Sequence, residues 1–519
     1  LWQFHLHYFN RLRTWLEKDI KNEKNNIKLQ IIEHLIIDWI DNNKKSSFDG
    51  WHSYTISIRI RNLLLFFSFH PELANEKYLS SIWQQLIWLD RHPESYLGGN
   101  HWLENLTALI FGSLFFENNK SNKIFLKALN KLENEIEIQI LEDGGHEERS
   151  SSYHILIIDR LVEIACLIYI FKNYHVDWLL KKINVMYLWI LKVRSKHKVL
   201  PRFNDNMIQS YQDIDDILNF ASSLINRKNL CKKGIRYELI RRCNFKIDHD
   251  LSNDFEFFDK SEINDLKDTG WLIIKSGNFY LTFKYGPSSP KHLPGHGHSD
   301  TLSFDLFFKN IPLIAETGTS TYEMGPQRSF ERSLRSHNAL QLGEIINRDN
   351  SQINWIEPVE IWDSFRAGRK AEIKHKNFGK YSKDIFWIEA SHDGYERINS
   401  KYSRKLIFKE IDKSQCSLKI IDYLTILNLT AWRSWWHLGP QQDEQILYPA
   451  IDYFVKNYNA KYKWENTYYA NTFNERIPRR SLCVEGVLSQ GQYKFGYEIK
   501  FIAKELSKNY KINYKDSLF

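Results

Sequence analysis

The segment of this 519-residue chain with the most reactive side chains is PGHGHSD at 294–300, with His292 just upstream. If it runs extended into the strand-like residues that follow, then His296, His298 and Asp300 alternate onto one face. Such a face suits either metal ligation or a catalytic histidine on a tight turn. An ordinary polar loop is the third interpretation.

Metal ligation would need a further group from elsewhere, because two histidines two residues apart cannot enclose an ion. Two candidates follow downstream, Glu316 in PLIAETGT and His337 in RSHNAL. Two imidazoles with one carboxylate suit Zn²⁺ better than Ca²⁺ or Mg²⁺. The spacing alone leaves the metal and catalytic interpretations open.

A second polar cluster, GGNHWLEN at 98–105, stands at the expected start of a helix. Asn100 and Glu104 are four residues apart and His101 and Glu104 three apart, so they can share a helical face. A carboxylate one turn from a histidine fixes its tautomer and favours the imidazolium. The alternative is that Asn100 caps the helix and His101 is an ordinary surface residue.

A third cluster, DGGHEERSSSYH at 143–154, makes a glycine turn and then enters an apolar helix. Tyr153 follows Arg149 by four residues, which could bring the guanidinium near the phenol. Tyrosine titrates near pH ~10, so it acts as a base only where cations stabilise the phenolate. The alternative is a half-buried tyrosine at a helix start.

Two other segments place charged residues where an apolar side chain or a plain loop would be expected. The proline-bounded loop KVLPRFNDN contains Arg202 and Asp205, and SIRIRN sets Arg59 and Arg61 inside an apolar segment. Each buried arginine needs a partner, which is either a salt bridge or a bound carboxylate.

The elements that carry these clusters change character along the chain. From residue 1 to 245 apolar residues recur every three to four positions, which predicts an all-helical domain. The run at 155–171 contains charged residues, so it predicts a buried helix rather than a membrane span. Residues 246–268 are acidic and aperiodic and are interpreted as a linker, and 269–519 show short strands typical of an antiparallel sandwich. The prediction is a multidomain α + β protein.

Composition narrows the function further. Aromatic residues make up 15% of the chain, enough for large cores and for aromatic surface in a carbohydrate cleft. The net charge of +8 suits a polyanionic substrate, and no nucleic-acid-binding signature is present. The five cysteines lack CxxC spacing, which argues against a disulfide framework.

The opening LWQFHLHYFN shows no leader, so the compartment stays open, with a periplasmic or secreted location favoured over the cytoplasm. No membrane insertion is expected, and the oligomeric state is left open.

Six segments, taken in order, resemble the heparinase II/III-type polysaccharide lyases and their alginate-lyase relatives. The segments are LWQFHLHYFN, NHWLEN, EERSSSYH, LPRFNDN, GHGHSDTLSFDLFFKNIPLIAETGT and RSHNAL, and they span residue 1 to about 440. The resemblance implies an N-terminal incomplete (α/α) toroid followed by a C-terminal antiparallel β-sandwich.

In the helical half the resemblance assigns roles to four residues. Asn100 and His101 correspond to the pair that neutralises the substrate carboxylate, and Glu104 to the acidic residue that assists the histidine. Tyr153 corresponds to the catalytic tyrosine.

In the second half His296 resembles the catalytic histidine, and the resemblance implies a structural zinc. His298 and His337 resemble zinc ligands, and Glu316 occupies the region of the third. Relatives usually have aspartate there in a DPG-like sequence, whereas this chain reads ETG.

The predicted substrate contacts come from loops and from the buried arginines. Arg202, Asn204 and Asp205 resemble a cleft loop in which relatives often carry Gly-Asp. Arg149 and Arg59 complete the predicted set.

These assignments predict cleavage of an acidic, uronate-containing polysaccharide by β-elimination. The uronate carboxylate must be neutralised before its C5 proton can leave, which Asn100 and His101 would do. Tyr153 would serve as acid and base, with His296 assisting. Two alternatives stay open: a non-catalytic glycan-binding or polysaccharide-assembly protein on the same scaffold, and a glycoside hydrolase.

Overall fold

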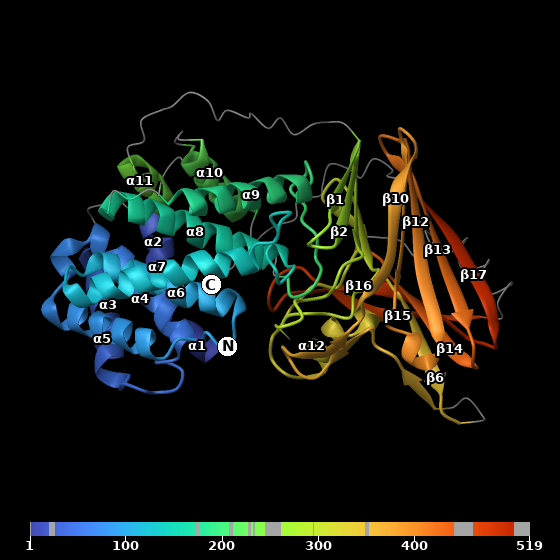
Figure 1. Cartoon of the computed structure of the whole chain (residues 1–519), viewed down its shortest axis with the longest axis horizontal. Helices are drawn as coiled ribbons and strands as arrows, with labels where there is room; N and C mark the ends of the chain where they lie inside the picture. Colours follow the sequence, from blue (N-terminus) through green and yellow to red (C-terminus); the bar gives the residue numbers. More distant parts are fainter. Residues whose placement is uncertain are drawn as a thin grey trace.

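Helices occupy the first half of the chain and strands the second, as the periodicity predicts. The computed structural model describes residues 2–19, 26–172, 174, 176–206, 211–226, 230–231, 234–243, 261–293, 295–347, 352–440 and 460–502. The predicted fold class is confirmed, with an N-terminal helical toroid followed by an antiparallel β-sandwich. Figure 1 shows the helices on one side and the sheets on the other.

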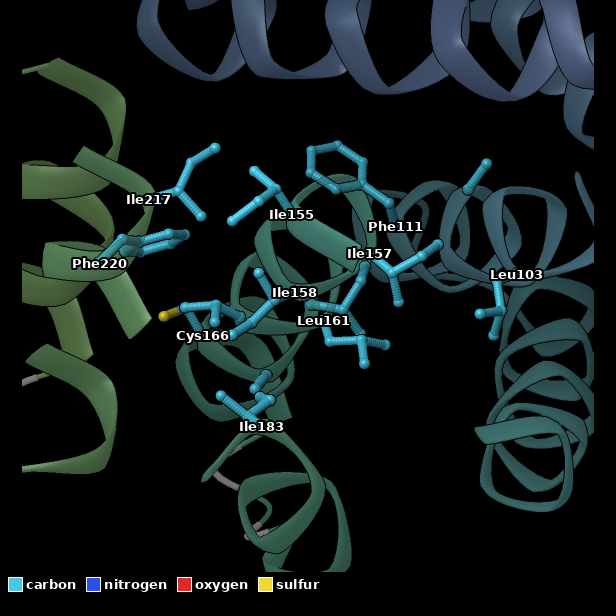
Figure 2. Close-up of a cluster of buried hydrophobic side chains, with 14 of the residues drawn as sticks. Leu103, Phe111, Ile155, Ile157, Ile158, Leu161, Cys166, Ile183, Ile217 and Phe220 are labelled. Atoms are coloured by element: carbon cyan, nitrogen blue, oxygen red, sulfur yellow. The ribbon is translucent and has the colours of Figure 1, made fainter. Parts of the chain in front are cut away.

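The helical domain is arranged around two helices that are apolar on nearly every side, α6 and α8. Helix α8 contacts α6, α9, α10 and α11, so its apolar sequence is buried all round. Figure 2 shows side chains of α6, α8, α9 and α10 meeting in this core. The helices are α1 Trp2–Leu6, α2 Asn10–Asp19, α3 Asn26–Asn42, α4 Ser53–Phe69, α5 Glu76–Arg91, α6 Gly99–Phe115, α7 Asn119–Gln139, α8 Ser151–Lys172, α9 Asp177–Val193, α10 Tyr211–Ile225 and α11 Gly234–Cys243. None of the helices in the described ranges is both long and apolar enough to cross a membrane.

Among the described residues, the strand domain contains three five-stranded sheets and a small hairpin, and all their pairings are antiparallel. The sheet orders are β1-β2-β3-β4-β5, β10-β11-β12-β13-β17 and β15-β16-β14-β6-β7, and the hairpin is β8-β9. The strands are β1 Glu262–Leu266, β2 Trp271–Ser276, β3 Phe279–Lys284, β4 Phe304–Phe308, β5 Ile311–Ile314, β6 Leu340–Ile345, β7 Ile353–Trp355, β8 Val359–Ile361, β9 Ala367–Lys370, β10 Ile373–Ser382, β11 Ile385–His392, β12 Ser400–Asp412, β13 Gln415–Ile426, β14 Thr430–His437, β15 Lys461–Ala470, β16 Arg476–Leu488 and β17 Gly491–Ile502.

The first sheet, β1 to β5, packs on both of its faces and joins the two domains. Along β2, Trp271 and Ile273 belong to the core of the helical domain, whereas Leu272 and Ile274 belong to the sandwich core. Successive strand residues point to opposite faces, so one strand serves two cores. In Figure 1 this sheet stands between the helices and the outer sheet that contains β12 and β13. Polar contacts add to the joint, since Tyr280 donates from β3 to the carbonyl of Val193 in α9 (2.6 Å).

The structure corrects two expectations about element boundaries. Strand β1 begins at Glu262, inside the segment 246–268 that was expected to be a linker, because these residues pair with β2. The rest of that segment, up to residue 260, lies outside the described residues. A short helix, α12 Pro326–Arg332, interrupts the strand domain where only strands were expected.

Candidate active site

Tyr153 from the helical domain and His296 from the strand domain meet at the domain interface. Tyr153 lies in the first turn of α8, and its phenol oxygen is 3.3 Å from Nδ1 of His296. The two ring centroids are 4.7 Å apart. His296 has a φ of 62°, so the expected extended run through the histidines is broken at its first member.

Asp205 connects the groups around this pair. Its Oδ2 lies 2.9 Å from Nδ1 of His296 and its Oδ1 lies 2.8 Å from Nε2 of His298. Arg328 in α12 donates to both oxygens, at 2.5 and 2.7 Å. The carboxylate is fully buried, so these partners replace its lost hydration. Asp205 therefore positions imidazoles instead of facing substrate.

The contacts of Asp205 fix which ring nitrogen of each histidine donates, and the surroundings of each ring shift its pKa. A carboxylate accepts, so Nδ1 of His296 carries a proton and Nε2 is the nitrogen left for chemistry. Burial would lower the pKa of His296, but the negative charges of Glu148 and Asp205 raise it above its usual value. His298 is more deeply enclosed, and burial lowers its pKa to about 3, so it is neutral at physiological pH.

A second phenol lies against the first. The hydroxyl of Tyr322, in the loop before α12, is 2.9 Å from that of Tyr153. Burial, with the neighbouring Tyr322 and Asp205, raises the pKa of Tyr153 well above its usual value. Tyr153 therefore keeps its proton in the resting protein, which suits a proton donor. Tyr322 was missed from the sequence, because STYEMG matches no motif and lies 169 positions from Tyr153.

Asn100 and His101, expected to act as a pair, face different partners. The amide of Asn100 donates to both oxygens of Glu148, at 3.0 and 3.1 Å, and its backbone N–H donates to the same carboxylate. His101 turns the other way, where its Nδ1 lies 3.0 Å from Glu94 and its ring is tilted against that of Tyr54, with the centroids 4.4 Å apart. Asn100 is buried, whereas 36% of the His101 side chain is exposed. His101 is thus the member of the pair that can meet a ligand.

The predicted contact between Glu104 and His101 is not formed. Glu104 accepts from Arg61 at 2.6 Å and from Arg160 at 3.0 Å, inside the helical domain. The three-residue spacing allows Glu104 to contact His101, but it does not require that contact. The buried arginines attract the Glu104 carboxylate more strongly than the partly exposed imidazole of His101 does. The residue that supports His101 is Glu94. Burial would raise the pKa of Glu94, but the hydrogen bond and charge of His101 lower it.

The three arginines predicted to bind substrate are all engaged elsewhere. Arg59 donates to Gln85 and to the carbonyl of Gly50 and is fully buried. Arg149 reaches the carbonyl of Asp268 across the interface (3.2 Å), not the phenol of Tyr153. Arg202 donates to the carbonyl of Ala470 and lies 4.0 Å over the ring of Tyr469. Each of the three arginines therefore binds another part of the protein, whereas the sequence suggested that it would face a substrate cleft.

Two further polar residues connect the helical and strand domains. Asn204 donates to the carbonyls of Arg149 and Ser288, at 3.1 and 2.7 Å, and so joins both domains. His292 in the strand domain lies 3.2 Å from Glu147 in the helical domain.

The three predicted zinc ligands pair with one another or with other protein groups in this structure. His337 donates through Nδ1 to Glu316, while His298 contacts Asp205, and their ring centroids are 5.5 Å apart. The ammonium of Lys284 lies close enough to act on the pKa of His337, so a cation of the protein already neighbours this group. In His337 the other ring nitrogen, Nε2, is buried without a hydrogen-bond partner. Among the described residues no group of three or more His, Cys, Asp or Glu could hold a metal ion. Zinc stays a prediction of the sequence.

Comparison with known families and structures follows the same two-domain division. The heparinase II/III N-terminus matches residues 3–230, and the heparinase II/III-like C-terminal family matches residues 259–492. A heparin-sulfate lyase of Bacteroides stercoris is 23% identical over 349 residues, which is 63% of this chain and 47% of that protein. The chain thus spans about half the length of that curated relative.

Two solved structures show the same fold. A crystal structure of heparinase III superposes with a TM-score of 0.71 at 14% identity and covers 96% of this chain and 77% of its own. A heparan sulfate lyase from Pedobacter heparinus gives 0.58 at 16% identity, with the same coverage of 96% and 77%. At these identities the likeness extends to the fold alone.

Proposed function

This chain belongs to the heparinase II/III-like family, and we propose on that premise that it is a lyase of uronate-containing polysaccharides. The observation that carries the proposal is the meeting of Tyr153 and His296 across the domain interface, with the imidazole oriented by Asp205. Family membership supports a glycosaminoglycan as the proposed substrate class. The names of the relatives point to the heparin and heparan sulfate type, and the net charge of +8 suits such a polyanion.

The reaction requires the protein to neutralise the uronate carboxylate, to supply a base and to supply an acid. The uronate carboxylate must lose its negative character so that the C5 proton becomes acidic. We assign this role to His101, which is partly exposed and has Glu94 as its partner. A base takes the C5 proton, and the electron pair forms the C4–C5 double bond. The C4–O4 bond breaks, and an acid gives its proton to the leaving oxygen.

We assign these proton transfers to two residues. Tyr153 retains its proton because its pKa is raised, so it serves as the acid toward O4. The available nitrogen of His296 is Nε2, which serves as the base once the imidazole is neutral. Tyr322, 2.9 Å from Tyr153, supports the phenol by a hydrogen bond. After turnover the imidazolium of His296, whose Nδ1 lies 3.3 Å from the phenol oxygen, returns a proton to Tyr153.

Incubation of the purified protein with a panel of polymers tests the proposal. The panel contains heparan sulfate, heparin, hyaluronan, chondroitin sulfate, alginate and bacterial capsule polymers. We expect the ultraviolet absorbance of the unsaturated uronate to appear with heparan sulfate or heparin.

The same panel separates the alternatives. New reducing ends without the chromophore would identify a hydrolase, and binding without any product would identify a glycan-binding protein. Either result contradicts the proposed elimination. Two carboxylates flanking one bond are the mark of a hydrolase, whereas Asp205 is buried and tied to three side chains.

A further inference from the structure

The turn between β8 and β9, residues 362–366, is held by two buried arginines that take no direct part in the proposed proton transfers. Arg332 donates to the carbonyls of Asp363 and Arg366, at 2.5 and 3.3 Å. Arg328 donates to the carbonyl of Ser364 at 2.6 Å. Both arginines lie in α12 and are nearly fully buried. Two guanidinium groups therefore fix a five-residue surface turn.

The turn is also tied directly to the reacting histidine. The backbone N–H of His296 donates to the carbonyl of Phe365 at 3.1 Å. From the outer side, Asp363 accepts from the backbone N–H groups of Phe365 and Arg366, at 2.9 and 2.8 Å. Residue 365 takes part in these bonds only through its backbone atoms, so they set its place whatever its side chain.

The side chain held at that place is an exposed aromatic ring. Phe365 is 40% exposed, although its ring centroid is 5.7 Å from that of His296 and 5.3 Å from that of Tyr322. The guanidinium of Arg328 lies 5.8 Å from the same ring. An isolated exposed phenylalanine needs no explanation, but one fixed by buried arginines beside a base and a phenol does.

We propose that Phe365 is a specificity-determining platform on which the pyranose ring next to the scissile bond rests its apolar C–H face. The inference deepens the proposed lyase function and rests on it. A sugar ring offers a C–H face with polar edges, which suits a fixed aromatic ring bordered by His296, Tyr322 and Arg328. The platform fixes the ring position relative to Nε2 of His296, and it takes no part in proton transfer.

The test compares heparan sulfate kinetics of wild type with Phe365→Ala, Phe365→Leu and Phe365→Tyr. Loss of one aromatic contact weakens binding by about 2- to 10-fold, so we expect Phe365→Ala and Phe365→Leu to raise KM by that factor with a smaller change in kcat. Phe365→Tyr keeps the ring and should keep the wild-type KM. Phe171→Ala is the matched control, because Phe171 is 52% exposed at the far end of α8.

Thermal unfolding and heparan sulfate binding, measured on each variant, keep the outcomes distinct. Equal KM and Kd for wild type and Phe365→Ala would overturn the platform while leaving the lyase function standing. A KM for Phe365→Leu as low as that for Phe365→Tyr would overturn the aromatic role. If wild type binds heparan sulfate without making product, the lyase function fails, and the Kd series alone decides the platform. If wild type neither binds nor cleaves any polymer, both proposals fall.

Discussion

This chain contains two clusters of buried charged side chains. They differ in whether their members can exchange protons at physiological pH. The helical cluster lies among α2, α4, α6, α8 and α11, and the interface cluster lies between the two domains. The helical cluster consists of Arg13, Arg61, Glu104, Asp159, Arg160, Glu163 and Arg236. The interface cluster consists of Tyr153, Asp205, His296, His298, Tyr322 and Arg328.

The helical cluster contains only groups whose charge is fixed at physiological pH. Burial would raise the pKa of Asp159, but Arg236, Arg13 and Arg160 hold it far below its usual value. In the interface cluster, imidazoles and phenols replace most of the guanidinium groups, so protons can be exchanged. In this chain the cluster of carboxylates and guanidinium groups connects helices. The cluster that also contains imidazoles and phenols forms the candidate active site.

The largest expected effect comes from breaking the centre of the interface cluster. Asp205→Asn places an amide beside Nδ1 of His296 and removes the charge that pairs with Arg328. We expect kcat on heparan sulfate to fall by about 10²- to 10⁴-fold, the usual contribution of an oriented acid–base group.

Asp300→Asn is the matched control for that substitution. Asp300 is equally buried in the adjoining loop but pairs with Lys284. A kcat loss as large in Asp300→Asn, for the same loss of thermal stability, would mean that Asp205 acts only through folding.

The next largest effect is on stability, in the helical cluster. Glu163→Gln leaves Arg61 and Arg13 with an unbalanced buried charge, which costs about 3–5 kcal/mol. We expect a lower melting temperature and denaturant midpoint but an unchanged kcat for the folded protein. Asp41→Asn, which breaks an exposed pair with Lys77, is the control and should cost no more than about 1 kcal/mol. A fall in kcat comparable to that of Asp205→Asn would erase the distinction between the clusters.

A smaller effect is expected on pH dependence. His296 must be neutral to act as a base, so the rate rises with pH through the raised pKa of its imidazole. Glu148→Gln removes the negative charge that contributes most to raising this pKa, so the rising limb should move to lower pH. The plateau kcat should change by less than about 10-fold, below the usual effect of losing an acid–base group. A limb that stays in place, or moves to higher pH, would rule out His296 as the titrating group.

The smallest expected effect is that of a chelator. Because Glu316 pairs with His337 and His298 with Asp205, we expect EDTA to leave the melting temperature unchanged. Stoichiometric zinc by elemental analysis, lost with a fall in melting temperature, would contradict this expectation and support the zinc predicted from sequence.

The comparison also shows how far the sequence could be taken. Apolar periodicity predicted the two domains and the buried α8. Tyr153 and His296 could be selected because each lies in a recognisable motif.

The partners of these residues could not be found in the same way. Glu94, Tyr322 and Arg328 lie in unremarkable segments, and the fold alone brings Arg328 to Asp205, 123 positions away. The helical spacing of Glu104 from His101 was compatible with contact, but it could not show that Arg61 and Arg160 lie on the other side. Local pattern indicates which residues can react, and tertiary packing decides which of them do.

The most direct measurement of the central claim is the rate of unsaturated uronate formation from heparan sulfate by wild type and by Tyr153→Phe. Tyr153→Phe removes one oxygen from the interface cluster and keeps the ring beside His296. The account predicts that kcat falls by about 10²- to 10⁴-fold while the Kd for heparan sulfate stays at the wild-type value. Equal turnover by the two proteins would contradict it.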